Sequence, residues 1–433
     1  MQKESLINVK YSSEKIIHTS LFIYLFLLIF PHTTTLREIS FWIAAICCVL
    51  LRLRKSEPFI PLNPIVISLS IFIGIAFISS VIGMEPLENL KRFKGELLIP
   101  FLLFLITATE YKTLQKAKSL FIAPVIAFAA YTVLVIGESF NYGFVYFWDR
   151  ATRQNLWLDG YGQIGITIFP ITLGMFLLNK DKWFKYSFLF FGIIELGILM
   201  AYRSFTVSLS AVSVLLLWVV FVRPRKYRLW MTIFISLFLF ITGLLLYSHR
   251  DHPAVKEYRT KLEKIADIPG EFMSEGGFSN RMPAWKAAID IIKDKPILGY
   301  GWGIKKFKEL VYQEKFLERW RESKPSVYEF YTVTVKDTFF PPHNLFLEIV
   351  VQSGLLGLVA FIIFIGIYLF SLIKETLRRS SETDNNFSVI LIGGTFLSFM
   401  IMNLMNDELG NVSGKILFVV LGASAAWMKN KPH

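Results

Sequence analysis

The 433-residue sequence is poor in cysteine and in charge. Its two cysteines, Cys47 and Cys48, are adjacent within an apolar run, a geometry poorly suited to a structural disulfide, so they carry no firm information on redox compartment. Charged residues make up only 18% of the chain, whereas 54% of it is hydrophobic and 16% aromatic. That balance excludes an ordinary soluble protein, whose surface must be wetted, and indicates the lipid bilayer as the solvent.

Other absences narrow the function. The chain has no internal repeat, no low-complexity tract and no Asp-x-Asp pair, so a metal-bound nucleotide-sugar donor has no evident site. The formal net charge is +13, but the basic residues are spread between apolar runs and form no single basic face. We therefore expect no nucleic-acid partner, no metal and no cofactor.

Long apolar runs recur along the chain, and about 20 mainly apolar residues suffice to cross a bilayer. We predict an all-α integral membrane protein with about twelve transmembrane helices and with the N-terminal run as its first anchor. The candidate spans are 16–31, 39–53, 63–83, 97–109, 116–137, 160–179, 184–202, 204–222, 228–247, 345–373, 387–405 and 414–428. The second and fourth are the shortest and are expected to be tilted or partly buried.

Lys and Arg concentrate in every second loop, which is the pattern of cytoplasmic loops in membrane proteins. The basic segments contain Lys3, Lys10, Lys15, Arg52, Arg54, Lys55, Lys112, Lys116, Lys118, Lys180, Lys182, Lys185, Arg223, Arg225, Lys226, Arg228, Lys374, Arg378, Arg379, Lys429 and Lys431. This asymmetry predicts that both the N- and the C-terminus are cytoplasmic.

The same topology divides the chain into three parts. Residues 1–247 hold spans one to nine, 248–342 form a large, mainly helical periplasmic loop, and 343–433 hold spans ten to twelve. Within the loop, Ser279 and Asn280 before Pro283 predict a helix start, and Pro296 predicts its end.

The loop then continues with glycines at alternate positions. Because no strand precedes Gly299-x-Gly301-x-Gly303 and no GK[ST] follows it, the pattern predicts a tight turn rather than a phosphate loop. Residues 305–321 follow it and predict a second, charged helix.

The segment from Phe339 to Glu348 is the most informative one. Two prolines place His343 at the entrance of a span on the outer membrane surface, with Asn344 as a helix N-cap and Glu348 one turn deeper on roughly the same face. An imidazole, with an unperturbed pKa of about 6.5, can accept a proton from a sugar hydroxyl. The alternative is an interfacial His that only caps the helix.

Two arginines occupy positions suited to an anion. Arg203 lies in a tight outward turn between two apolar helices, with Glu195 as a possible partner, and charges at such depth are usually functional or paired. Arg281 begins the loop helix, whose free N–H groups and dipole also favour an anion, and Trp285 follows one turn later. The alternatives are a snorkelling interface anchor for Arg203 and an exposed structural residue for Arg281.

Together these segments resemble the O-antigen ligase family of multispanning bacterial enzymes, which is related to O-antigen polymerases. The resemblance covers the layout of spans and loop along the whole chain, and at residue level three places. These are Arg203 in the turn after a span, Arg281 with Trp285 in the large loop, and His343, Asn344, Glu348 and Gly354 to Gly357 before and within the next span. Tyr202 stands where many relatives carry a small or hydroxyl residue.

The resemblance implies transfer of O-antigen from undecaprenyl pyrophosphate to a hydroxyl of lipid A-core oligosaccharide on the periplasmic face. His343 would be the general base and Arg203 and Arg281 would bind the pyrophosphate, with Asn344, Glu348 and Trp285 in support. No metal or nucleotide would be needed, and the anomeric centre would be inverted. The partners would be the lipid-linked glycan donor, the lipid A-core acceptor and membrane lipid.

Three other functions stay open on the sequence. An O-antigen polymerase would use the same donor with a second lipid-linked glycan as acceptor, and a protein O-oligosaccharyltransferase would use a serine. A secondary transporter could also have twelve spans, although transporters tend to show paired interrupted helices and internal symmetry. Here the ionisable residues gather at one face instead.

Overall fold

The computed structural model describes residues 2–58, 60–142, 160–201, 205–248, 281–303, 306–335, 341–379, 381–406 and 408–429. Within these ranges the chain forms helices joined by short connections, and no strand occurs there. The prediction of an all-α protein is therefore confirmed for the part of the chain that the structure describes.

The helices that precede the large loop are α1 (Gln2–Leu27), α2 (Thr34–Lys55), α3 (Pro64–Ile82), α4 (Pro86–Phe93), α5 (Ile99–Glu110), α6 (Leu114–Tyr142), α8 (Tyr161–Leu178), α9 (Lys182–Ala201), α10 (Phe205–Phe221) and α11 (Arg225–Ser248). A π-helical turn, Lys94–Leu98, joins α4 to α5. Local sequence explains several starts. For example, α3 begins with Pro64 in its first turn, and the Asn63 side chain accepts a hydrogen bond from the Val66 amide.

The helices of the loop and of the C-terminal part are α14 (Arg281–Asp294), α15 (Lys306–Val311), α16 (Glu314–Ser323), α17 (Pro325–Glu329), α18 (Leu345–Arg378), α19 (Glu382–Asn386), α20 (Thr395–Asn403) and α21 (Val412–Lys429). Two further π-helical segments extend α17 over Phe330–Thr334 and join α19 to α20 over Phe387–Gly394.

Each of the twelve predicted spans overlaps a helix or a helical segment of the described residues. Six helical segments of the described chain are long and apolar enough to cross a bilayer, namely Pro64–Ile82, Leu114–Gly137, Tyr161–Leu178, Leu345–Arg378, Glu382–Asn403 and Val412–Lys429. These segments support a multi-pass membrane protein. The full number of twelve stays a prediction.

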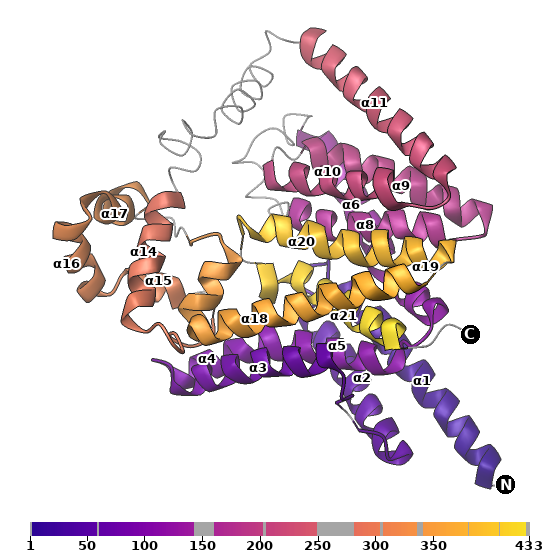
Figure 1. Cartoon of the computed structure of the whole chain (residues 1–433), viewed down its shortest axis with the longest axis horizontal. Helices are drawn as coiled ribbons and strands as arrows, with labels where there is room; N and C mark the ends of the chain where they lie inside the picture. The colour runs from indigo at the N-terminus through magenta and orange to yellow at the C-terminus, as the bar shows by residue number, and fades with distance from the viewer. Residues whose placement is uncertain are drawn as a thin grey trace.

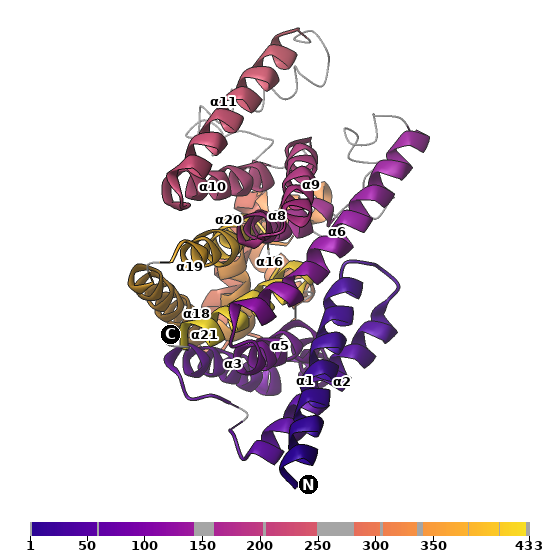
Figure 2. The same cartoon turned by 90° about the vertical axis from the view of Figure 1, so that its right-hand side faces the viewer.

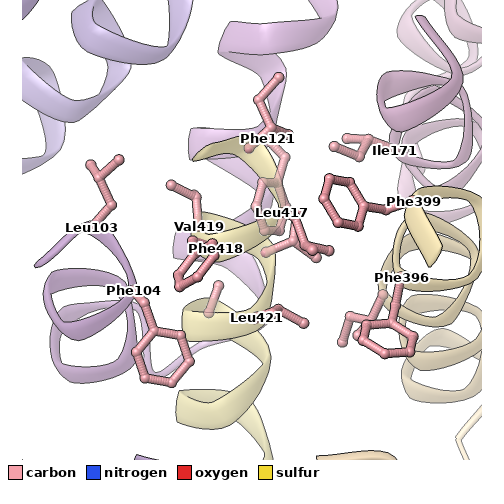
Figure 3. Close-up of a cluster of buried hydrophobic side chains, with 14 of the residues drawn as sticks. Leu103, Phe104, Phe121, Ile171, Phe396, Phe399, Leu417, Phe418, Val419 and Leu421 are labelled. Carbon is pink, nitrogen blue, oxygen red and sulfur yellow. The ribbon is translucent and has the colours of Figure 1, made fainter. Parts of the chain in front are cut away.

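Helix α21 occupies the middle of the bundle. Leu417, Phe418 and Leu421 on this helix are almost fully buried, and in Figure 3 their side chains meet those of α5, α6, α8 and α20. Phe104 and Phe399 close this apolar cluster from opposite sides. Helix α21 is thus the packing centre, while α1 and α2 pair with each other at the edge of the bundle (Figure 2).

The basic loops meet at one end of the bundle. The Lys118 ammonium donates to the Leu178 carbonyl, and the Asn386 side chain bonds both the amide and the carbonyl of Arg223. The Arg379 guanidinium donates to the Trp427 carbonyl at the end of α21. Figure 1 shows this end, with both termini, opposite the loop helices α14 to α17.

The loop has its own hydrophobic core. Residues from α14 to α17 enclose Trp320 and Tyr331, whose rings stack with centroids 6.1 Å apart. The predicted helix start near Pro283 and its end before Pro296 are confirmed by α14. The single helix predicted over 305–321 is wrong, because the chain breaks between α15 and α16 so that Phe307 and Trp320 both reach this one core.

Candidate active site

Helix α14 carries Arg281 in its first turn and Trp285 one turn later, so both side chains project from one face. Arg281 is half-buried, and burial lowers the pKa of its guanidinium. Within the described residues no carboxylate forms an ion pair with Arg281 that would offset this desolvation. A guanidinium in that state, next to the positive end of a helix dipole, gains strongly from an added anion.

Trp285 connects this helix to the chain before α18. Its indole Nε1 donates a 2.7 Å hydrogen bond to the carbonyl oxygen of Pro342, the residue that precedes His343. Helix α14 also packs against α18. The structure therefore brings Arg281, Trp285 and His343 onto two elements that are joined by a direct bond.

His343 stands at the turn into α18. Its backbone has a φ of 47°, in the left-handed region that residues other than glycine rarely adopt, and its side chain is half-buried. Backbone strain of this kind persists only where surrounding contacts impose it, and it is concentrated at functional sites.

Asn344 is the N-cap of α18, as predicted. Its side-chain oxygen accepts from the Leu347 amide at 3.1 Å, and its side-chain nitrogen donates to the Leu404 carbonyl at 3.1 Å. Both ends of the amide thus bind backbone groups. These contacts fix the start of α18 against the end of α20, and so they fix the position of the neighbouring His343.

Glu348 is buried one turn into α18 and accepts a 2.9 Å hydrogen bond from Gln352. The Gln352 side-chain oxygen in turn accepts from the Gly303 amide at 3.1 Å. A small cavity of about 20 Å³, lined in part by Glu348, Gln352, Glu96 and Trp302, lies here and has room for about one water molecule. The carboxylate therefore belongs to a polar chain that reaches the glycine-rich turn.

Helix α18 is not one straight span. Gly354 has φ 67° and ψ −174°, a conformation essentially restricted to glycine, and it kinks the helix between Leu345–Ser353 and the rest. A Cβ atom at this position would lie 2.1 Å from the Ile297 carbonyl oxygen. The span predicted over 345–373 falls on α18, and the kink within it depends on this close approach of a distant segment.

Near the kink, backbone N–H and C=O groups of α18 lack partners within the helix. Residues of the preceding glycine-rich turn, between Pro296 and Gly301, supply these partners. Leu355 N–H donates to the Pro296 carbonyl at 2.7 Å, whereas Tyr300 and Gly301 donate to the Val351 and Gln352 carbonyls at 3.0 and 2.9 Å. The glycine-rich segment predicted to be a turn is one, and its positive-φ glycines let it lie directly against α18.

The same turn anchors the loop on the bundle. The Ser79 hydroxyl oxygen lies 2.6 Å from both the Leu298 and the Gln352 carbonyl oxygens. The buried Lys306 ammonium pairs with Glu85 at 3.0 Å and with Glu309 at 2.7 Å. The sequence offered one signal of this docking, the alternating glycines, and it gave no indication of Ser79 or Lys306.

Arg203 lies outside the described residues, between the end of α9 and the start of α10. Its approach to Arg281 and His343 therefore stays a prediction. Glu195, its proposed partner, is fully buried in α9, where it interacts with the Thr172 side chain of α8.

Fold and site together define a polytopic helical membrane protein with a compact loop fixed beside the entrance of a kinked helix. Residues 188–362 match the model of the O-antigen ligase family, and this segment includes Arg203, Arg281 and His343. The predicted resemblance to that family is confirmed over these residues and supports a lipid-linked glycan transferase of the ligase and polymerase type. A search of curated proteins gives no match.

Proposed function

We propose that the chain transfers O-antigen from undecaprenyl pyrophosphate to a hydroxyl of lipid A-core oligosaccharide, as an inverting glycosyltransferase that uses no metal. The observation that carries this proposal is the O-antigen ligase match over 188–362, which spans all three residues of the predicted site. The Trp285–Pro342 hydrogen bond supports it, because it joins the helix that begins with Arg281 to the segment that ends in His343.

In this mechanism the acceptor hydroxyl attacks the anomeric carbon of the first glycan sugar. The new glycosidic bond forms as the bond to the pyrophosphate oxygen breaks, and attack from the opposite face inverts the centre. His343 takes the hydroxyl proton, and undecaprenyl pyrophosphate leaves with its charge neutralised by Arg281 and Arg203. Since pyrophosphate is already a good leaving group, orientation and charge neutralisation supply most of the catalysis.

The proposed site faces the periplasm of a bacterial inner membrane, and both termini are cytoplasmic. Two observations support this arrangement. The basic loops contact one another at one end of the bundle, and short loops rich in Lys and Arg are cytoplasmic. The loop helices lie at the opposite end, where a periplasmic acceptor would approach (Figure 1).

The test is a transfer assay with the full chain in nanodiscs, lipid-linked O-antigen as donor and labelled lipid A-core as acceptor. A ligase moves the glycan onto the labelled core and releases undecaprenyl pyrophosphate. Donor that grows longer while the core stays unmodified would show a polymerase instead. Glycan on an added serine-containing protein would show a protein transferase, and no transfer to any acceptor would contradict the proposal.

A further inference from the structure

A second cavity lies away from the proposed active site. It has a volume of about 710 Å³ and is enclosed by α8, α9, α10 and α11 at the end of the bundle where the basic loops meet. The volume is in the range of roughly 300–1,000 Å³ that is typical of pockets for small ligands. None of the residues assigned to glycan transfer lines it.

The inner wall of this cavity is apolar. Leu173 on α8, Leu196 on α9 and Trp218 on α10 are among its lining residues, and all three are almost fully buried. At the rim, Tyr186 and Trp230 are exposed by 61% and 69%. Figures 1 and 2 show that α11 diverges from α10 along its length.

Four lysines line the same cavity at its basic end: Lys180, Lys182, Lys185 and Lys226. Within the described ranges none of them forms an ion pair with a carboxylate. Lys185 donates to the Tyr227 hydroxyl at 2.7 Å and lies over the Phe176 ring at 5.1 Å. The nearby acid in the chain, Asp181, accepts from the Phe184 amide at the start of α9. The cavity therefore combines uncompensated positive charge with an apolar interior.

We propose that this cavity binds one anionic phospholipid of the cytoplasmic leaflet, with the phosphate on the lysines and an acyl chain against the apolar wall. Charge complementarity selects the headgroup, since basic pockets between transmembrane helices on the cytoplasmic side bind anionic lipid. Tyr and Trp at the rim suit the headgroup level, where such rings gather. A free phosphate would leave the apolar interior empty, so the lipid is the occupant that uses both halves.

Native mass spectrometry of the purified, detergent-solubilised full chain tests this proposal. The ligands are palmitoyl-oleoyl phosphatidylglycerol, the matching phosphatidylcholine and glycerol 3-phosphate, each titrated separately. We expect saturable binding of one phosphatidylglycerol molecule. Phosphatidylcholine and glycerol 3-phosphate should each bind at least about tenfold more weakly. If phosphatidylcholine binds equally well, the lysines do not select the headgroup. If glycerol 3-phosphate binds equally well, the acyl chain does not contribute to binding. Either result overturns the proposal.

Two variants locate the site. The triple variant Lys180→Gln/Lys182→Gln/Lys226→Gln should weaken phosphatidylglycerol binding at least about tenfold, because it removes three charges that attract the headgroup. The control Arg54→Gln/Lys374→Gln/Lys429→Gln removes three exposed charges from other basic segments and should bind normally. Equal losses in both triple variants would mean a diffuse surface charge effect and would overturn a site in this cavity.

The apolar half has its own variant. Leu189 lines the cavity, so Leu189→Trp fills part of it with an indole ring and should weaken phosphatidylglycerol binding at least about tenfold. Leu216 is exposed on α10 and does not line the cavity, so Leu216→Trp should leave binding unchanged. All variants are compared with wild type for thermal stability without lipid. If Leu189→Trp melts normally and still binds phosphatidylglycerol as well as wild type does, the acyl chain lies elsewhere and the proposal fails.

Discussion

The indole nitrogen of Trp285 donates a 2.7 Å hydrogen bond to the carbonyl oxygen of Pro342. This bond joins the first helix of the loop to the residue before His343. Because Arg281 precedes Trp285 by one helical turn, the bond also couples the position of the guanidinium to that of the imidazole. In the proposed mechanism, these two groups act on the leaving pyrophosphate and on the attacking hydroxyl.

Trp285→Phe should lower kcat/KM for glycan transfer by about two- to tenfold, since the net value of one such hydrogen bond is about 0.5–1.5 kcal/mol. The aromatic ring and its packing are kept, so the variant should reach normal membrane levels. Trp183→Phe is the matched control, because Trp183 is 86% exposed on α9. An unchanged kcat/KM in Trp285→Phe would show that the bond does not position the site.

His343→Asn should lower transfer by about 10²–10⁴-fold, the usual contribution of a general base. Asparagine tolerates the left-handed backbone found at this position better than alanine does, so the change removes the imidazole with little added strain. The measurement is the fraction of lipopolysaccharide capped with O-antigen, at matched membrane levels of both proteins. Normal capping would exclude His343 from the mechanism.

Gly354→Ala should destabilise the protein by more than about 1 kcal/mol, because alanine is strained at this φ and its Cβ would lie 2.1 Å from the Ile297 carbonyl oxygen. Gly366→Ala, in the same helix with nothing within 4 Å of the added Cβ, should be neutral or slightly stabilising. Thermal unfolding in detergent compares the two. Equal melting temperatures would argue against the kink.

The ion pair between Glu85 and Lys306 predicts a pH effect on docking of the loop. The hydrogen bond and charge of Lys306 lower the pKa of Glu85 below its usual 4.5. A carboxylate whose pKa is lowered in the folded state stabilises the protein at any pH above its unfolded-state pKa. This stabilisation is lost as the pH falls through the folded-state pKa. Glu85→Gln should therefore melt below wild type near pH 7, and the gap should narrow as the pH falls below the usual carboxylate pKa of 4.5. A constant gap would mean that the carboxylate charge contributes nothing.

Glu195 allows a test of its proposed pairing with Arg203. A fully buried carboxylate whose neighbour is only the Thr172 side chain, with no counter-charge among the described residues, is costly, so Glu195→Gln should melt at the wild-type temperature or above it. A pair with Arg203 would instead make the variant clearly less stable, because the guanidinium would lose its counter-charge. The double variant Glu195→Gln/Arg203→Gln separates the two cases, since only a real pair gives non-additive shifts.

The positions of the helices could be predicted from the sequence because hydropathy is a local property. Each predicted span falls on a helix, and Asn344 caps α18 as its residue type and place indicated. The start of α14 was predictable for the same reason, since Pro283 belongs in a first turn.

The arrangement around Gly354 could not be predicted in this way. An apolar run with one glycine is compatible with a straight helix, and the kink exists because Pro296 and Ile297 lie against it from a distant part of the chain. The docking of Lys306 on Glu85 is equally non-local. The family resemblance identified the candidate site residues. Tertiary contacts bring Arg281, Trp285 and His343 close together, and no local sequence pattern encodes such contacts.

The most direct test is a cryo-EM reconstruction of the His343→Asn variant in nanodiscs with a polyprenyl pyrophosphate-linked glycan. We expect density for the pyrophosphate against the guanidinium groups of Arg281 and Arg203, with the first sugar facing position 343. Pyrophosphate density at the opposite end of the bundle, among Lys180, Lys182 and Lys226, or remote from the start of α14, would contradict the proposed active site.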